Sequence, residues 1–168
     1  MRYFIVGVLT GVIAVAVGLA LAVWFWPWQV EAVGIPGQSE IAVMRILLDR
    51  ALKREAPRLA NPFPPSPENL TAGMKIFREG CAGCHGDGLN RSTWGTTSFF
   101  PRVPQFATEP PNRPDWQIYW IVRNGIRNTG MGAWKQLLTD DQIWQVTGFV
   151  SHINSLPEDV STAWHKRQ

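Results

Sequence analysis

Both cysteines of this 168-residue chain lie in one short segment, which reads EGCAGCHGDG. Two residues separate Cys81 from Cys84, and His85 follows the second cysteine directly. Two cysteines at this spacing can form a redox dithiol, supply half of a zinc site, close a small disulfide or attach a haem. The rest of the sequence must therefore indicate which chemistry the segment performs.

The first three of these alternatives lack the surroundings that they need. A thioredoxin-type dithiol lies at a helix start in a βαβ unit, and the sequence shows no alternating strand pattern. A zinc site needs four ligands, but the other histidines, His152 and His165, repeat no metal-ligand spacing. A disulfide across two residues would close a tiny loop and stabilise little. The C-x-x-C-H pattern therefore predicts covalent attachment of haem c.

The predicted chemistry uses all three side chains of the motif. Cys81 and Cys84 would form thioether bonds to the two vinyl-derived positions of the porphyrin, and His85 would lie beneath the iron as proximal ligand. Both thiols are consumed by this attachment, which suits a chain that has no other cysteine in an oxidising compartment. One motif predicts one covalently bound haem c with its iron.

The ligand on the other side of the iron decides between electron transfer and chemistry on a bound small molecule. Met131 lies in the segment NTGMGAW, 46 residues after His85, where flanking glycines let the backbone approach the ring closely. We predict Met131 as the sixth ligand, because a thioether favours ferrous iron and fills the last open position. His152 is the main alternative ligand, and Met131 could also be a loop residue that touches only the haem edge or solvent. Met74, on the helix before the motif, is interpreted as core packing.

Helical patterns lie on both sides of the motif and must position it. Ser66 as N-cap and Pro67 at the first helical position predict a helix that continues to Gly80. Its apolar face has a gap at Gly73, where another helix could approach closely. A further helix fits residues 114–124, and Gly125 would end it.

The last predicted helix begins with a capping box formed by Thr139 and Gln142, and Pro157 marks its stop. Its apolar face comprises Ile143, Val146, Phe149, Val150 and Ile153. These patterns predict an all-α domain over residues 66–157 with long connecting loops, followed by a C-terminal tail over residues 158–168.

The N-terminal segment is apolar and carries no charge between residues 2 and 31. A helix from Phe4 to Trp26 would be about 34 Å long, enough to cross a hydrocarbon core of about 30 Å. Three tryptophans, Trp24, Trp26 and Trp28, cluster at its far end, where an interfacial aromatic belt is expected. Arg2 at the other end biases that end toward the cytoplasm. We predict that residues 1–30 are a single-pass anchor in a bacterial-type cytoplasmic membrane, with the haem domain on the periplasmic side. The alternative is a cleaved secretory signal, because ALA at residues 20–22 suits a signal peptidase.

Residues 31–65 connect the predicted anchor to the domain. Ser39 can cap an amphipathic helix that runs to about Ala56 and has an apolar face formed by Ile41, Met44, Leu48, Ala51 and Leu52. This face could pack on the protein's own domain, dock on a partner subunit or lie on the membrane surface. The segment NPFPPSP follows, and its four prolines favour an extended tether.

The charge distribution argues against nucleic acid as a partner. The chain has a net charge of +3, and from Asn61 onward ten Lys and Arg face nine Asp and Glu without a basic run. Nine tryptophans are many for this length and suit a membrane interface or a large apolar cofactor pocket.

From about Ser66 to Pro157 the sequence resembles a class I c-type cytochrome domain. The resemblance rests on GMKIFREGCAGCHG, IVRNGIRNTGMGAW and LTDDQIWQVTGFV, in that order, and the first of these is the most specific. It implies three to five helices around one covalent haem, a low-spin iron with His85 and Met131 as ligands, and outer-sphere electron transfer at the haem edge. It also implies that the first and last helices cross near Gly73, Phe77 and Phe149.

One feature departs from that family. Many members carry a Gly-Pro-x-Leu element whose proline carbonyl accepts a hydrogen bond from the proximal histidine. The corresponding region here reads STWGTTSFFPRVPQFA, so either Pro101 or Pro104 could take that role. The resemblance does not extend to residues 1–65.

These observations predict an electron-transfer protein rather than an enzyme. We expect a membrane-bound monohaem cytochrome that serves as a subunit of a respiratory or photosynthetic complex, with redox proteins and other subunits as partners. A free-standing tethered shuttle is the alternative, and a haem-based enzyme or gas sensor is a weaker one. Six Lys and Arg between Gly88 and Lys135, against one Glu and one Asp, could bind haem propionates or steer an acidic partner.

Overall fold

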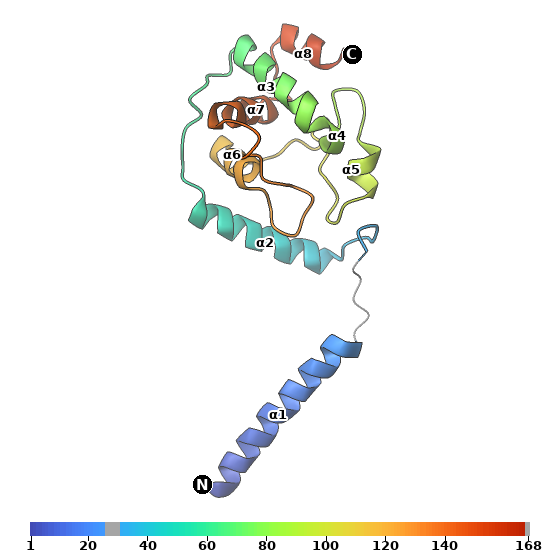
Figure 1. Cartoon of the computed structure of the whole chain (residues 1–168), viewed down its shortest axis with the longest axis vertical. Coiled ribbons are helices and arrows are strands. Elements are labelled where there is room, and N and C mark those ends of the chain that lie inside the picture. Colours follow the sequence, from blue (N-terminus) through green and yellow to red (C-terminus); the bar gives the residue numbers. More distant parts are fainter. Residues whose placement is uncertain (26–30, 167–168) are drawn as a thin grey trace. The chain divides into compact units, whose positions relative to one another are not determined.

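The computed structural model describes residues 1–25 and 31–166, and all regular structure in these ranges is helical (Figure 1). The predicted all-α class is therefore confirmed. The chain divides into two compact units, Met1–Glu31 and Ala32–Gln168. The candidate haem motif belongs entirely to the second unit.

The first unit contains helix α1, Arg2–Phe25, which has 24 residues. Its mean hydropathy is 2.7 and none of its residues is buried, so it is a candidate membrane span by length and composition. A signal sequence near an N-terminus has the same properties. Trp24 lies exposed in its last turn, whereas Trp26 and Trp28 lie outside the described residues.

The second unit begins with helix α2, Gln38–Glu55, which starts earlier than predicted. Its N-cap is Gly37, whose carbonyl oxygen accepts the first helical hydrogen bond from the Ile41 amide at 3.1 Å. The expectation that Ser39 caps this helix is therefore wrong, because Ser39 is itself helical. Glycine is a good N-cap residue, so Gln38 and Ser39 can join the first turn.

Helices α3, Pro67–Gly80, and α7, Asp140–Ser151, form the centre of the domain and cross closely. Gly73 allows this approach, since a Cβ atom there would overlap the Gln145 carbonyl oxygen and lie 2.8 Å from the Phe149 Cβ. The rings of Phe77 and Phe149 pack with their centroids 5.6 Å apart. The crossing predicted near Gly73, Phe77 and Phe149 is confirmed, as is Met74 as a buried core residue.

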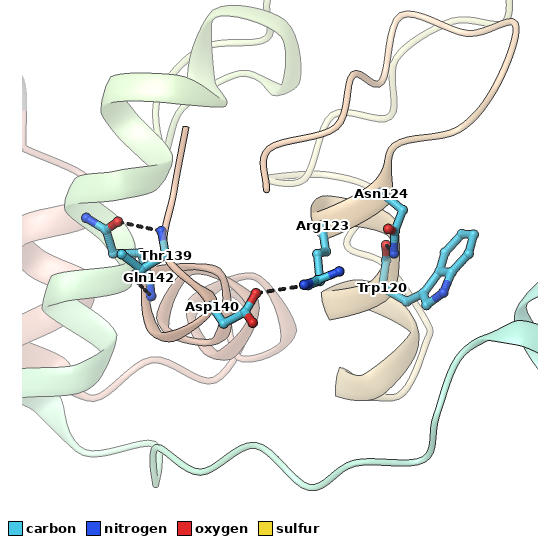
Figure 2. A network of polar contacts seen from close by, with 6 residues as sticks. All are labelled: Trp120, Arg123, Asn124, Thr139, Asp140 and Gln142. Atoms are coloured by element: carbon cyan, nitrogen blue, oxygen red, sulfur yellow. Dashed lines mark hydrogen bonds and ion pairs between the residues drawn. The ribbon is translucent and has the colours of Figure 1, made fainter. Parts of the chain in front are cut away.

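Helix α6, Asp115–Asn124, packs beside α7, and an ion pair joins the two helices. The Arg123 Nε donates to the Asp140 Oδ1 at 2.9 Å, next to the capping box that begins α7 (Figure 2). The predicted box is confirmed, since the Gln142 amide donates to the Thr139 Oγ1 and the Thr139 amide to the Gln142 Oε1. Gly125 ends α6 with a φ of 71°, a left-handed conformation that favours glycine.

Helix α8, Glu158–Trp164, extends the packed unit beyond the predicted boundary at Pro157. Val160 and Trp164 are buried in the main core, and the Trp164 ring meets Phe77 and Phe149 edge-on at 5.6 and 5.1 Å. Residues 158–164 are therefore not an appended tail. The sequence indicates α8 only weakly, through the acidic first turn that follows Pro157.

The proline-rich segment after α2 is attached to the domain. The Asn61 Nδ2 donates to the Trp144 carbonyl oxygen at 3.2 Å. The Phe63 side chain packs against a core cluster formed by Tyr119, Ile143 and Trp144. The segment predicted as an extended tether thus contacts the domain through Asn61 and Phe63, while Pro62, Pro64 and Pro65 are exposed.

Candidate haem site

The C-x-x-C-H motif occupies one turn of helix at the end of α3. Cys81 is the C-cap of α3 and precedes the short helix α4, Ala82–His85. The amides of Cys84 and His85 both donate to the Cys81 carbonyl oxygen, at 3.1 and 2.9 Å. This turn presents two thiols and one imidazole from consecutive positions of a rigid helix end, as covalent haem attachment requires.

Burial disfavours the ionised form of both thiols of the motif. Burial raises the pKa of Cys81 to about 12, and the neighbouring Cys84 adds to that rise. Burial also raises the pKa of Cys84. A redox dithiol instead needs one cysteine whose pKa is lowered. The environment of the motif therefore argues against thiol–disulfide chemistry.

The His85 ring is oriented by two contacts from the loop that follows the motif. Its Nδ1 donates to the Pro104 carbonyl oxygen at 2.9 Å, which leaves Nε2 as the free lone pair for a metal. The Phe106 ring stacks on it with centroids 4.2 Å apart and an angle of 18°. Burial lowers the pKa of His85, and the Pro104 hydrogen bond opposes that shift. The structure thus selects Pro104, not Pro101, as the orienting carbonyl.

Gln105 ties this loop to the motif and was not identified from the sequence. Its side chain is buried, and its Nε2 donates to the carbonyl oxygens of Cys84 and Val103, both at 3.0 Å. Its Oε1 accepts from the Ser92 amide at 2.7 Å. No local sequence pattern indicates this role of Gln105, because its hydrogen-bond partners lie up to 21 residues away along the chain.

Helix α5, Thr93–Thr97, presses directly against the motif. Gly95 is buried there, and a Cβ atom on it would overlap the Cys84 carbonyl oxygen and lie 2.8 Å from the Cys84 carbonyl carbon. The Val103 amide in turn donates to the Gly95 carbonyl oxygen at 3.1 Å. The motif, α5 and the loop through Pro104 therefore form one packed unit.

Met131 lies half-buried in the loop after α6. Its carbonyl oxygen accepts from the Ile126 amide at 2.9 Å and its amide donates to the Thr129 Oγ1 at 3.1 Å. Gly130 packs under the Phe99 ring, so the Met131 loop meets the loop that follows α5. These hydrogen bonds fix the backbone that carries the thioether.

A second contact brings the other side of this loop to the motif. The Trp134 ring lies against Gly80, where a Cβ atom would be 2.7 Å from its Cη2. Gly80 directly precedes Cys81, so contacts near the motif flank Met131 on both sides. These contacts place the loop that carries Met131 beside the residue that precedes the motif.

The alternative ligand His152 has a local role in the structure. It is the C-cap of α7, and its Nδ1 donates to the Gly148 carbonyl oxygen at 2.9 Å. Within residues 1–25 and 31–166, no group of three or more His, Cys, Asp or Glu side chains could hold a metal ion.

Comparison with known proteins matches the central part of the chain to one family. The family model described as "Cytochrome C oxidase, cbb3-type, subunit III" matches residues 68–150. A search of curated proteins gave no match.

Two solved structures are similar at low identity. A chain of the reducing HAO-like protein complex of Kuenenia stuttgartiensis is 22% identical, with a TM-score of 0.42 and coverage of 69% of this chain and 60% of that chain. Cytochrome cL of the marine methylotroph Methylophaga aminisulfidivorans MPT is 19% identical, with a TM-score of 0.41 and coverage of 80% and 83%. The chain thus spans about 60% of the length of the first of these. TM-scores this low support no inference about function.

The family match covers the C-x-x-C-H turn, the Pro104 carbonyl that orients His85 and the crossing of α3 with α7. Covalent haem c is the cofactor of this family, and it is attached through two thiols and ligated by an oriented imidazole of such a turn. Residues 68–150 are therefore a class I c-type cytochrome domain, and members of this family are electron-transfer proteins.

Proposed function

We propose that this protein carries one haem c, attached at Cys81 and Cys84, with His85 and Met131 as the two axial ligands of the iron. The hydrogen bond from the His85 Nδ1 to the Pro104 carbonyl oxygen carries the proposal, because it presents Nε2 to a metal and fixes the ring. The bound haem would supply an iron that accepts and releases single electrons. The protein would exclude exogenous ligands by placing the Met131 thioether at the sixth position.

Other residues of the chain would shape the behaviour of the site. Phe106 holds the His85 ring in place by stacking, and Trp134 covers the start of the motif at Gly80. A methionine ligand raises the reduction potential relative to a second histidine. We therefore expect outer-sphere electron transfer and no catalytic residues.

Two methionine variants test the ligand assignment against each other. Met131→Ala should abolish the ferric methionine–iron charge-transfer band, because the thioether is then absent. Met74→Leu should keep the band, since Met74 is a core residue on α3. A band that survives in Met131→Ala would refute Met131 as the ligand. A wild-type protein without the band would favour His152 instead.

We further propose that the protein is anchored by α1 in a bacterial-type cytoplasmic membrane, with the haem domain on the periplasmic side, and acts as a subunit of a respiratory or photosynthetic complex. The length and apolar composition of α1 support the anchor. Detergent solubilisation followed by native mass analysis tests the rest. Co-purifying subunits would support a complex, and a monomer would indicate a tethered shuttle.

Three cations are available to attract an acidic redox partner. Of the six between Gly88 and Lys135, three are engaged within the protein: Arg102 with backbone carbonyls, Arg113 with Asp49, and Arg123 with Asp140. The other three are exposed, and their side chains make no hydrogen bond or ion pair with the described residues: Arg91, Arg127 and Lys135. We propose that these three steer association, so that electron-transfer rates fall as salt is added. Rates that do not respond to ionic strength would remove this part of the proposal.

A further inference from the structure

Helix α2 is fixed to the domain along one face. Leu52 is fully buried and Ala56 nearly so, at the C-terminal end of the helix. The Asp49 Oδ1 forms an ion pair with the Arg113 guanidinium at 2.8 Å. The amphipathic helix therefore packs on its own domain, which was one of the alternatives that the sequence left open.

The segment before α2 is held by a second clamp. The Arg102 guanidinium donates to the carbonyl oxygens of Val33 at 2.9 Å and Gly34 at 3.3 Å. The same group donates to the Phe99 carbonyl oxygen at 3.2 Å, in the loop after α5. Both ends of the α2 region are thus tied to the unit that contains the haem motif.

The opposite face of α2 is apolar in its first half and has no cover within the described residues of the second unit. Val43, Ile46 and Leu47 are 54%, 52% and 53% exposed. At the helical repeat these side chains point away from Leu52. This second apolar stripe was not predicted. The predicted apolar face contains Leu52, which is fully buried, and Met44, which is 41% exposed.

Basic residues continue the same outward face in the second half of α2. Viewed down the helix axis, Arg50, Lys53 and the three apolar residues share one arc of about 120°. Both are exposed, and their side chains bond to no described residue. Of the acidic residues of α2, Asp49 pairs with Arg113 and Glu55 pairs with Arg54 at 2.8 Å. Glu40, in the first turn, lies about 20° beyond Leu47 at the edge of the outward face.

We propose that this outward face lies on an anionic phospholipid surface, with Val43, Ile46 and Leu47 at the headgroup–acyl boundary and Arg50 and Lys53 at lipid phosphates. An exposed apolar stripe joined to unpaired cations is the pattern of a helix that lies in the membrane interface. The proposal rests on the anchoring of α1 proposed above. Twelve residues separate Phe25 from Gln38, so the chain can reach at most about 45 Å from the end of α1.

The consequence concerns the orientation of the haem domain. Because α2 is tied to the domain by Leu52, the Asp49–Arg113 pair and the Arg102 clamp, a membrane-bound α2 would fix the domain relative to the bilayer. The domain would then present one constant face to partners in the membrane and would not swing freely.

Spin labels on single introduced cysteines test the proposal in the full-length holoprotein. Haem attachment consumes both native thiols, so each variant has one free cysteine. Ile46→Cys reports on α2, Ala14→Cys on the middle of α1, and Thr162→Cys on an exposed position of α8. Power saturation with oxygen and a water-soluble nickel complex measures depth in nanodiscs of phosphatidylcholine with or without phosphatidylglycerol.

We expect the oxygen-to-nickel accessibility ratio at position 46 to rise severalfold when phosphatidylglycerol is included, while position 162 stays aqueous. Adding Arg50→Gln and Lys53→Gln to the Ile46→Cys variant should remove most of that rise. A reduced-minus-oxidised spectrum of each variant checks that the haem domain is intact.

Several outcomes would overturn the proposal, and they differ from failure of the anchor. An aqueous label at position 46 with a deep label at position 14 refutes the lipid contact and leaves the anchor standing. An aqueous label at position 14 refutes the anchor and the proposal with it. A label at position 46 that is immobilised only when other subunits co-purify, or a dimer in native mass analysis, assigns the face to a protein partner. A rise that the glutamine variants do not reduce refutes recognition of anionic lipid.

Discussion

Replacing Gly95 by alanine should weaken the structure around the haem motif. The new Cβ would overlap the Cys84 carbonyl oxygen and lie 2.8 Å from its carbonyl carbon, whereas ordinary contact begins at 3.4 Å. The backbones of α5 and the motif must therefore separate by about 0.6 Å or more. A shift of this size lengthens the 3.0 Å hydrogen bond from the Gln105 Nε2 to the Cys84 carbonyl oxygen beyond an effective length.

These two effects set the expected loss of stability. Forcing a methyl group into a packed interior costs about 1–3 kcal/mol, and leaving a buried carbonyl without its donor costs about 1–3 kcal/mol. Since one shift causes both, we expect the free energy of unfolding of Gly95→Ala to fall by about 2–4 kcal/mol. Guanidinium unfolding of the ferric holoprotein, followed by circular dichroism and by the haem absorption band, measures the change.

Gly83→Ala provides a matched control inside the motif itself. Gly83 lies in α4, and a Cβ atom there meets no atom of the described chain within 4 Å. Alanine is favoured over glycine in helices by about 0.5–1 kcal/mol, so this variant should be as stable as wild type or slightly more stable. If Gly95→Ala unfolds at the same denaturant concentration as Gly83→Ala, α5 does not press on the motif and the reasoning fails.

Three further variants test the packing with the same unfolding assay. Gly73→Ala should lose about 1–3 kcal/mol, because its Cβ would lie 2.8 Å from that of Phe149; wild-type stability would contradict the α3–α7 crossing. Gln105→Leu should lose about 2–4 kcal/mol, because it leaves three backbone groups around the motif without a partner, and a neutral effect would show that water replaces the side chain. Trp164→Ala should lose about 3–5 kcal/mol through its contacts with Phe77 and Phe149, and a loss below about 1 kcal/mol would mean that α8 is not part of the core.

Much of the fold could be predicted because its signals are local. Ser66 accepts from the Asn69 amide at 3.4 Å as an N-cap, and the capping box at Thr139 opens α7, so both central helices carry their start signals in four residues. The start of α2 was predicted wrongly at Ser39, because the sequence alone does not distinguish a serine in the first turn of a helix from a serine at the N-cap. The burial of α8 depends on Phe77, which lies about 80 residues away, and no short pattern reports such a contact.

The candidate site shows the same division between local and distant signals. The motif at residues 81–85 is complete in five residues, so it could be recognised locally, and the lack of strand and zinc-ligand patterns elsewhere then favoured haem attachment. The choice between Pro101 and Pro104 depended on how the loop after α5 closes, which Gly95 and Gln105 determine through contacts with Cys84. Distant pairs of this kind could be recognised only once the chain was folded.

The outward face of α2 shows why an amphipathic pattern can mislead. The helix carries two apolar stripes. In the first, the domain buries Leu52 and half-buries Ile41, Leu48 and Ala51, whereas Met44 is 41% exposed. The other stripe, around Ile46, has no cover within the described residues of the second unit. The periodic pattern was read as a single apolar stripe, as expected of an amphipathic helix. A helix with apolar residues on two faces does not fit that pattern, so the second stripe was missed.

The coordination of the iron tests the central claim most directly. Ferrous wild-type protein should show no spectral change when it is exposed to carbon monoxide, because the proposed ligands His85 and Met131 would occupy both axial positions. Formation of a carbon monoxide complex by the untreated protein would show an open or weakly held site. That result would contradict a cytochrome whose haem only transfers electrons.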